Sequence, residues 1–425
     1  MRSAEYRERH HGKTLGILVG GGPAPGINGV IRAATIEAKE AGLRVVGIKE
    51  GSRWLSAGDT KHVVELDIDD VSRIHYLGGS ILGTSRVNPT KSEEMMKNTI
   101  GALTEIGVDF LVTIGGDDTA FTAQTIDRLT GTQIEVAHVP KTIDNDLPLP
   151  GSMPTFGYQT ARHLGTALVQ NLMEDAVTTQ RWYYVVAMGR SAGHLALGIS
   201  KAASATLAVI PEEFRGKPIR FKHLADILEG SVLKRRMMGR VHGVAILAEG
   251  LAEHIPAEDL AQLDDIERDA HGNIRFSEIE LGTLLKKEVR RRLKARGVDI
   301  TIVEKNIGYE LRCTPPIPFD MEYTQDLGFG AVRYLLDGNT GALICMIEGK
   351  LVPIKFEDML DPATGKTRIR RVDVDSDNFK VAREYMVRLD KNDFEDQKQL
   401  ARLARAANVD GSTFMDEFGY LGGDQ

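Results

Sequence analysis

Short apolar runs that each end in a glycine-rich or acidic segment recur along this chain of 425 residues, and this pattern most constrains its fold. The four runs, each with the segment that follows it, are 15–19 before 20–26, 108–114 before 115–119, 134–139 before 140–146, and 183–187 before 188–193. The first run and its glycine-rich segment are followed by a helical pattern over 27–40 and then by a strand pattern over 43–48. Strands that alternate with helices predict parallel sheets. Ligands of such sheets bind beyond the carboxyl ends of the strands, so these segments predict a binding site.

Composition excludes several classes of protein. The length predicts at least two domains, and a hydrophobic content of 42% with 27% charged residues is ordinary for a globular enzyme. No apolar run approaches the roughly 18 residues of a membrane span, and residues 1–13 show no secretion signal. Cys313 and Cys345 have no CxxC neighbour, which predicts a cytoplasmic, reduced protein. A net charge of −7 disfavours nucleic acid as a partner, although a local basic cluster could still bind a small anion.

The glycine segment 20–26 fits neither of two common nucleotide motifs. Pro23 and Pro25 interrupt the spacing of a dinucleotide fingerprint, and no GK[ST] follows as in a P-loop. Glycine lets backbone N–H groups approach a phosphate at the start of the helix over 27–40. A tight turn that needs only positive φ is an equally good interpretation of this segment alone.

The segment 140–146, with the sequence PKTIDND, holds an amine, a hydroxyl, an amide and two carboxylates where a strand should end. By itself it could be a polar turn, since Asn and Asp favour turns. Together with the acidic segment 115–119 and the glycine segment, it predicts a chemical site at the strand ends.

Five motifs occur in an order and spacing that resemble the phosphofructokinase family, and within it the pyrophosphate-dependent branch. They are GGPAPGIN over 21–28, LGTSR over 82–86, GGDDT over 115–119, PKTIDND over 140–146 and MGR over 188–190. The resemblance covers about residues 14–394. It implies an α/β fold of two doubly wound, Rossmann-like domains with mainly parallel sheets and an active site in the cleft between them. The expected domains are 1–156 with 313–375 for the phosphoryl donor, and 157–312 with 376–425 for the sugar phosphate, with an insertion near 250–277.

The resemblance implies a reversible transfer of a phosphoryl group from pyrophosphate to the 1-hydroxyl of fructose 6-phosphate, as in glycolysis and gluconeogenesis. Phosphoryl transfer needs a base near the acceptor and neutralisation of charge. Asp144 is expected to be the base, Asp117 the ligand of Mg²⁺, and Arg190 the cation at the transferring group. An alternative is that Asp144 and Asp146 both bind metal and no base is needed.

Further substrate contacts are carried over from the family. Residues expected to bind substrate, besides Asp144 and Arg190, are Gly22, Arg86, Lys141, Thr142, Ile143, Asp146, Arg181, Met188, Gly189, Glu249, Tyr309 and Arg312. Arg312 and Arg181 should hold the 6-phosphate, and Tyr309 stands where compact ATP-using members carry His. The counterpart of Arg181 enters from a neighbouring subunit, which implies a homodimer or homotetramer. The family carries a further arginine, and Lys305 lies near its position in the sequence but does not align with it.

Two residues favour pyrophosphate over ATP as the donor. ATP-using relatives usually read GGDGS and GTIDND, whereas this chain has Asp118 and Lys141. Asp118 places a negative charge where an α-phosphate would pass, and Lys141 offers an ammonium to pyrophosphate. The alternatives are an ATP-dependent enzyme of the same fold and a pyrophosphate-dependent kinase that also accepts sedoheptulose 7-phosphate. A lipid or NAD kinase, a non-catalytic phosphate sensor and a dehydrogenase fit the motifs less well.

Overall fold

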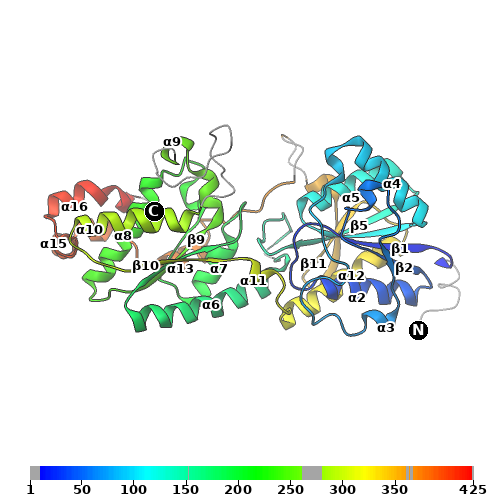
Figure 1. Cartoon of the computed structure of the whole chain (residues 1–425), viewed down its shortest axis with the longest axis horizontal. Helices are drawn as coiled ribbons and strands as arrows, with labels where there is room; N and C mark the ends of the chain where they lie inside the picture. The colour runs from blue at the N-terminus through cyan, green and yellow to red at the C-terminus, as the bar shows by residue number, and fades with distance from the viewer. Residues whose placement is uncertain (1–9, 152, 261–279, 360–362, 364–366, 424–425) are drawn as a thin grey trace. The chain divides into compact units, whose positions relative to one another are not determined.

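The computed structural model describes residues 10–151, 153–260, 280–359, 363 and 367–423. The chain forms two compact units, one of residues 1–161 with 309–370 and one of residues 162–308 with 371–425. The sequence predicted these domain boundaries after residues 156, 312 and 375. Each unit is a layered α/β structure built on its own sheet (Figure 1). The predicted fold class, α/β with mainly parallel sheets, is confirmed.

The first unit is built on a sheet of eight strands, in the order β12-β11-β5-β4-β1-β2-β3 with β6 paired to β5. Its strands are β1 (Thr14–Val19), β2 (Arg44–Ile48), β3 (Val63–Glu65), β4 (Phe110–Gly115), β5 (Glu135–Thr142), β6 (Phe156–Gly157), β11 (Ala342–Ile347) and β12 (Lys350–Lys355). β3 and β12 pair antiparallel at the two edges, and the strands between them are parallel. Since β1, β4 and β5 are central, the segments that follow them share one edge of the sheet.

Helices cover both faces of this sheet. They are α2 (Ile27–Glu40), α3 (Ile68–Val71), α4 (Glu93–Ile106), α5 (Asp117–Thr130), α11 (Tyr309–Arg312) and α12 (Pro318–Leu336). α2 and α12 lie on one face, and α4 and α5 on the other (Figure 1). Ser92 caps α4 by accepting the Met95 N–H at 3.2 Å, which fixes the start of that helix.

The second unit has a sheet of four parallel strands in the order β10-β7-β9-β8. These are β7 (Trp182–Ala187), β8 (Leu207–Val209), β9 (Gly243–Ala248) and β10 (Ile302–Ile307). Its helices are α7 (His194–Ala203), α8 (Phe221–Met237), α9 (Ala257–Leu260), α10 (Leu281–Ala295), α13 (Asp377–Glu384), α14 (Lys391–Glu395), α15 (Gln397–Ala406) and α16 (Gly411–Phe418). α6 (Tyr158–Thr179) begins in the first unit and continues in the second. Among the described residues, no helix is long and apolar enough to cross a membrane.

Several local predictions are confirmed and others need correction. The helix over 27–40 is as predicted, and α10 buries a stripe that includes Leu281 and Leu293. The predicted strand over 134–139 runs on to Thr142, because β6 pairs with β5 at Lys141 and Thr142. Residues 309–312 form the short helix α11, not a strand end.

Three further predictions concern helix ends. The helix expected from residue 191 begins at His194, because Gly193 is its N-cap. The helix expected over 379–389 ends at Glu384, since Val387 N–H bonds to the Thr206 carbonyl at 2.8 Å beside β8. The capping box predicted at Ser277, and most of the insertion near 250–277, lie outside the described residues.

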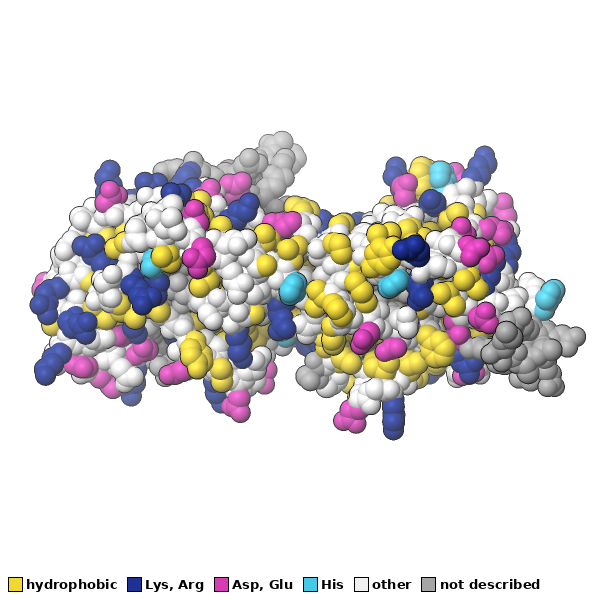
Figure 2. Space-filling model, turned by 90° about the horizontal axis from the view of Figure 1, so that it is seen from below, with side chains coloured by type: hydrophobic (Ala, Val, Ile, Leu, Met, Phe, Trp, Pro, Cys, Tyr) yellow, Lys and Arg dark blue, Asp and Glu magenta, His cyan; other side chains and the backbone are white. Residues whose placement is uncertain are grey.

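The surface carries mixed charge on the face that Figure 2 shows, where Lys and Arg side chains lie among Asp and Glu side chains. A nucleic-acid surface would present a continuous basic stretch.

Candidate active site

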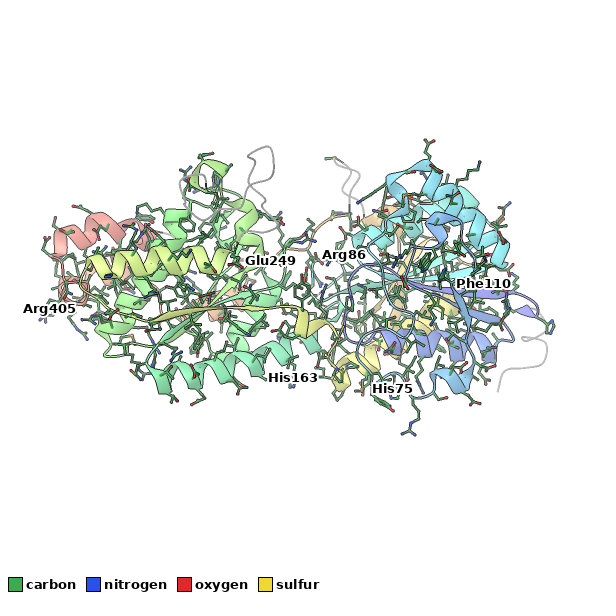
Figure 3. All side chains as sticks on the ribbon, viewed as in Figure 1. His75, Arg86, Phe110, His163, Glu249 and Arg405 are labelled. Atoms are coloured by element: carbon green, nitrogen blue, oxygen red, sulfur yellow. The ribbon has the colours of Figure 1, made fainter. Side chains whose placement is uncertain are left out.

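Three of the predicted segments meet at the carboxyl edge of the first unit's sheet. The Gly20 N–H donates to the Ile114 carbonyl at 2.9 Å, which joins the end of β1 to the end of β4. The Gly21 N–H donates to the Ser85 carbonyl at 2.8 Å, which brings in the LGTSR segment. Arg86 lies at this edge, opposite Phe110 at the amino end of β4 (Figure 3). The glycine, LGTSR and GGDDT motifs therefore form one structure.

The position of the Thr119 side chain accounts for the need for glycine at two positions. A Cβ at Gly20 would lie 2.3 Å from the Thr119 Oγ1, and a Cβ at Gly115 would lie at the same distance. Real Cβ atoms do not approach so closely, so both positions need glycine for space. The sequence suggested glycines needed for positive φ, and that reason applies instead to Gly21 at φ 79° and Gly26 at φ 102°.

Three cationic side chains of the first unit converge on Gly22. The Lys141 ammonium donates to the Gly22 carbonyl. A Cβ at Gly22 would lie 2.8 Å from an Arg312 Nη1 and 3.8 Å from an Arg86 Nη2. The Arg312 guanidinium also lies 4.6 Å from the centre of the Tyr309 ring, a cation–π contact. A glycine segment with three cations around it is arranged to bind a phosphate-bearing anion.

Lys141 is an unusual lysine because it is almost fully buried, with 4% of its surface exposed. Burial lowers the pKa of its ammonium from 10.5 to about 8. The nearby Asp144 carboxylate acts in the opposite direction, and the charges of Arg312 and Arg86 lower the pKa further. An anion bound beside Gly22 would supply the negative charge that this cluster lacks.

Acidic side chains lie on the neighbouring side of the same edge. Asp117 and Asp118 form the first turn of α5, where the helix N-terminus stabilises negative charge. The Asn88 amide donates to the Asp118 Oδ1 at 3.3 Å, and both Asp117 and Asp118 are exposed. Burial and then the charge of Asp117 raise the pKa of the Asp146 carboxyl, so Asp117 and Asp146 are close enough to repel.

This pair of carboxylates fits a divalent cation. A hard cation such as Mg²⁺ needs only one or two carboxylates, with water and phosphate oxygens completing its shell. The mutual repulsion of Asp117 and Asp146 would be relieved by a cation bound to both. No cluster of three or more His, Cys, Asp or Glu side chains suited to a metal occurs among the described residues.

The loop that carries Asp144 turns sharply after β5. The Asp144 N–H donates to the Thr142 Oγ1 at 3.0 Å, and the Thr155 hydroxyl donates to the Thr142 carbonyl at 2.7 Å. Asn145 adopts a left-handed φ of 58°, which Asn tolerates better than most residues. Its Oδ1 accepts the Thr155 N–H at 3.0 Å. Thr142, Ile143, Asp144 and Asp146 thus belong to one hydrogen-bonded turn.

The second unit has its own loop at the carboxyl edge of its sheet. The Met188 N–H donates to the Ile307 carbonyl at 3.0 Å, and the Gly189 N–H donates to a Glu249 Oε2 at 3.2 Å. A Cβ at Gly250 would lie 2.2 Å from the Arg190 carbonyl oxygen, so that position also needs glycine. The structure therefore brings together Met188, Gly189, Arg190 and Glu249, which the sequence placed in one group.

Arg181 lies at the other end of the same strand. It precedes the six residues of β7, and at about 3.3 Å per residue it lies roughly 20 Å from the MGR loop. Its nearest ion-pair contact is Asp175 at 3.9 Å. Within one chain Arg181 and Arg190 thus lie at opposite ends of β7, and the sharing of Arg181 between subunits stays a prediction.

Some residues that shape these loops were not predicted from the sequence. His138 in β5 is fully buried, and burial lowers its pKa to about 3, so its ring is neutral. Its Nε2 donates to the Gly115 carbonyl at 3.0 Å, while the Nδ1 accepts from the Thr113 hydroxyl at 2.8 Å. Glu212 and Arg370 also hold loops of the site. His138 is a single His in an apolar run, and Glu212 and Arg370 have like-charged neighbours in sequence, so neither pattern indicates such a role.

The architecture and the site together define a class. Glycine turns, converging cations and paired carboxylates at the carboxyl edge of a parallel α/β sheet are typical of enzymes that bind phosphorylated substrates with a divalent metal. The chain belongs to the phosphofructokinase family, since the family description "Phosphofructokinase" matches residues 14–335.

Relatives with curated names include both pyrophosphate- and ATP-dependent enzymes. The chain is 54% identical over 391 residues to a pyrophosphate–fructose 6-phosphate 1-phosphotransferase of Thermotoga maritima, a match that covers 91% of this chain and 93% of that one. It is 52% identical over 417 residues to a protein of the same name from Naegleria fowleri, covering 96% and 95%. An ATP-dependent 6-phosphofructokinase of Trypanosoma brucei brucei is 34% identical, covering 80% and 68%.

Solved structures resemble the fold. A pyrophosphate-dependent phosphofructokinase from Nitrosospira multiformis superposes with a TM-score of 0.67 at 16% identity, covering 88% of this chain and 90% of that one. A phosphofructokinase from Saccharomyces cerevisiae gives 0.65 at 20% identity, covering 96% and 49%. At such identities the likeness concerns the fold alone.

Proposed function

We propose that this protein transfers a phosphoryl group from pyrophosphate to the 1-hydroxyl of fructose 6-phosphate, which makes it a diphosphate–fructose-6-phosphate 1-phosphotransferase. The observation that carries this proposal is the convergence of Lys141, Arg86 and Arg312 on Gly22. Relatives above 50% identity that carry this name support the proposal. A buried ammonium beside the glycine turn suits a compact polyanion such as pyrophosphate.

Residues of the first unit would supply the base and two of the cations for the reaction. Asp144 accepts the proton of the sugar 1-hydroxyl, and that oxygen attacks the near phosphorus of pyrophosphate. The bond between this phosphorus and the bridging oxygen breaks, and phosphate leaves. Lys141 and Arg86 neutralise the phosphate oxygens throughout, which is the main catalytic contribution expected in such a transfer.

Members of this family generally use a divalent metal, and we propose Mg²⁺ for this protein. Asp117 would hold it, with Asp146 beside it. When bound, the cation neutralises charge on the phosphate oxygens.

The acceptor site would combine residues of both units. Glu249 would bind sugar hydroxyls, with Thr142, Ile143, Met188 and Gly189 shaping the acceptor site, and Arg190 would neutralise the transferring group. Arg312, with Tyr309, and Arg181 from a second subunit would hold the 6-phosphate, so the enzyme would be a homodimer or homotetramer. Since Arg312 also lies beside Gly22, it is placed to act on the donor phosphates too.

One assay tests the proposal. Purified protein is mixed with fructose 6-phosphate and Mg²⁺, and fructose 1,6-bisphosphate formation is compared with pyrophosphate and with ATP as the donor. The expected result is turnover with pyrophosphate and at least tenfold less with ATP. Faster turnover with ATP would favour the ATP-dependent alternative, which the Trypanosoma relative exemplifies. Sedoheptulose 7-phosphate in a third reaction measures the breadth of the acceptor site.

A further inference from the structure

Arg370 contacts the turn that carries Asp144 and Asp146 at several points. Its Nε donates to the Asn145 carbonyl at 3.0 Å, and its Nη1 donates to the Met153 carbonyl at 2.7 Å. Its Nη2 donates to the Asn145 Oδ1. Its own backbone N–H donates to the Asp146 carbonyl at 2.7 Å. One residue thus bonds two consecutive residues of the turn, Asn145 and Asp146, and the nearby Met153.

Asn145 is the part of the turn that most needs support. It sits between the two carboxylates in a left-handed conformation, at φ 58°, which costs a residue other than glycine free energy. Such a conformation persists only where the surroundings hold it. Arg370 bonds both the main-chain and the side-chain oxygen of Asn145, and the Thr155 N–H completes the side-chain bonding.

The guanidinium is suited to this task by its shape. Its donors form a rigid planar fork, so three acceptors in different directions are held in a fixed arrangement. Lysine has a single ammonium on a flexible stem and cannot reproduce that arrangement. The side chain of Arg370 donates to carbonyl and amide oxygens, and its charge also acts to lower the pKa of the nearby Asp146 carboxyl.

We propose that Arg370 is a positioning residue that fixes the 143–146 turn through Asn145 and so sets the orientation of Asp144 and Asp146 for phosphoryl transfer. This inference rests on the proposed function for its kinetic consequence, but the hydrogen bonds that carry it do not. Catalytic geometry is sensitive, and a displacement of about 1 Å can cost roughly 100-fold in rate. Arg370 lies more than 220 residues from Asp144 in sequence, which is why no motif contains both.

A second contact supports a fixed position for this part of the chain. Two residues after Arg370, the Val372 N–H donates to a Glu212 Oε1 at 3.1 Å within the second unit. The same Oε1 accepts the Gly193 N–H at 2.9 Å, at the start of α7 after the MGR loop. Arg370 is therefore bonded within the first unit, and Val372 separately within the second.

The first test uses Arg370→Ala, Arg370→Lys and the control Arg371→Ala, whose side chain is exposed. We expect Arg370→Ala to lower kcat about 10- to 100-fold with KM values for pyrophosphate and fructose 6-phosphate within about threefold. Arg370→Lys should fall between Ala and wild type, and Arg371→Ala should match wild type. Unchanged kcat in Arg370→Ala, or a loss that only follows the fraction of unfolded protein, overturns the proposal.

The second test asks whether Arg370 acts through Asn145. Asn145→Gly keeps the left-handed backbone and removes the side-chain acceptor, so the double variant should lose less than the two single losses combined. Full additivity contradicts the proposal. Hydrogen exchange of the amides over 143–156, measured without substrate, should be faster in Arg370→Ala than in wild type. That readout does not depend on the reaction, so absent wild-type turnover refutes the proposed function, and unchanged exchange refutes the role of Arg370.

Discussion

The Lys141 ammonium donates a hydrogen bond to the carbonyl oxygen of Gly22, which ties β5 to the glycine turn that follows β1. The bond places a buried cation directly beneath the backbone that is proposed to bind the donor. It also makes the charge state of one lysine decisive for donor binding. The pKa of that ammonium, lowered to about 8, lies near neutral pH.

The first prediction concerns pH. Below pH 8 the ammonium of the free enzyme is mostly charged, and it loses its proton as the pH rises through about 8. Because pyrophosphate favours the charged form, kcat/KM for pyrophosphate should fall by up to tenfold per pH unit above 8. Pyrophosphate itself also loses a proton in alkaline solution. The variant Lys141→Arg, whose side chain stays charged, is therefore measured in parallel as a control. The prediction is wrong if both proteins show the same alkaline fall.

The same shift has a consequence for stability. The folded pKa of Lys141 is below its unfolded value, so between about pH 8 and 10.5 the unfolded chain binds more protons than the folded one. Stability therefore rises with pH in this window, as far as Lys141 is concerned. Lys141→Met should lack this rise and should unfold at a higher urea concentration than wild type at pH 7, without ligand. Urea titrations at pH 7 and pH 9.5 measure both effects.

The second prediction concerns the base. Asp144→Asn keeps the size and the backbone hydrogen bond of the turn, since Thr142 bonds the residue's N–H and not its side chain. Loss of a general base should lower kcat by roughly 10² to 10⁴. KM for fructose 6-phosphate should change little. Near-normal turnover would remove Asp144 from the mechanism.

The order and identity of the main strands could be predicted because buried parallel strands are continuous apolar runs. The runs before 20, 115, 140 and 188 all became strands, and the motifs after them cluster within each unit. The predictions that failed concern the ends of elements and the roles of single residues. Lys141 belongs to a strand because β6, more than a dozen residues away in sequence, pairs with it. Thr119, His138, Glu212 and Arg370 were missed because their roles depend on long-range contacts that leave no spacing pattern.

The third prediction follows from one of those contacts. The Glu212 Oε1 accepts two backbone N–H groups, those of Gly193 and Val372, and Glu212 is only 9% exposed. Glu212→Ala leaves both donors without this partner, at about 1–3 kcal/mol each. We expect a loss of about 2–5 kcal/mol in the free energy of unfolding. Glu212→Gln keeps an acceptor oxygen and should lose less than half as much, measured by urea unfolding. Equal losses would mean that the carboxylate charge matters, and not the acceptor.

The last prediction concerns the choice of donor. Asp118 is exposed at the start of α5 with a single side-chain bond from Asn88, so it is free to repel an α-phosphate. Asp118→Gly should therefore raise kcat/KM with ATP. It should lower kcat/KM with pyrophosphate by a smaller factor, because Asp118 itself holds no phosphate.

Lys141→Gly should do the opposite. It removes a buried charged contact worth about 1.5–3 kcal/mol, or roughly 10- to 150-fold in kcat/KM with pyrophosphate. It also empties the space beside Gly22 that the lysine side chain fills. The double variant should then prefer ATP more strongly than either single variant. The measurement is kcat/KM with both donors in wild type, the two single variants and the double variant. If Asp118→Gly gains nothing with ATP, or if wild type already prefers ATP, then repulsion at Asp118 and attraction at Lys141 do not set the donor.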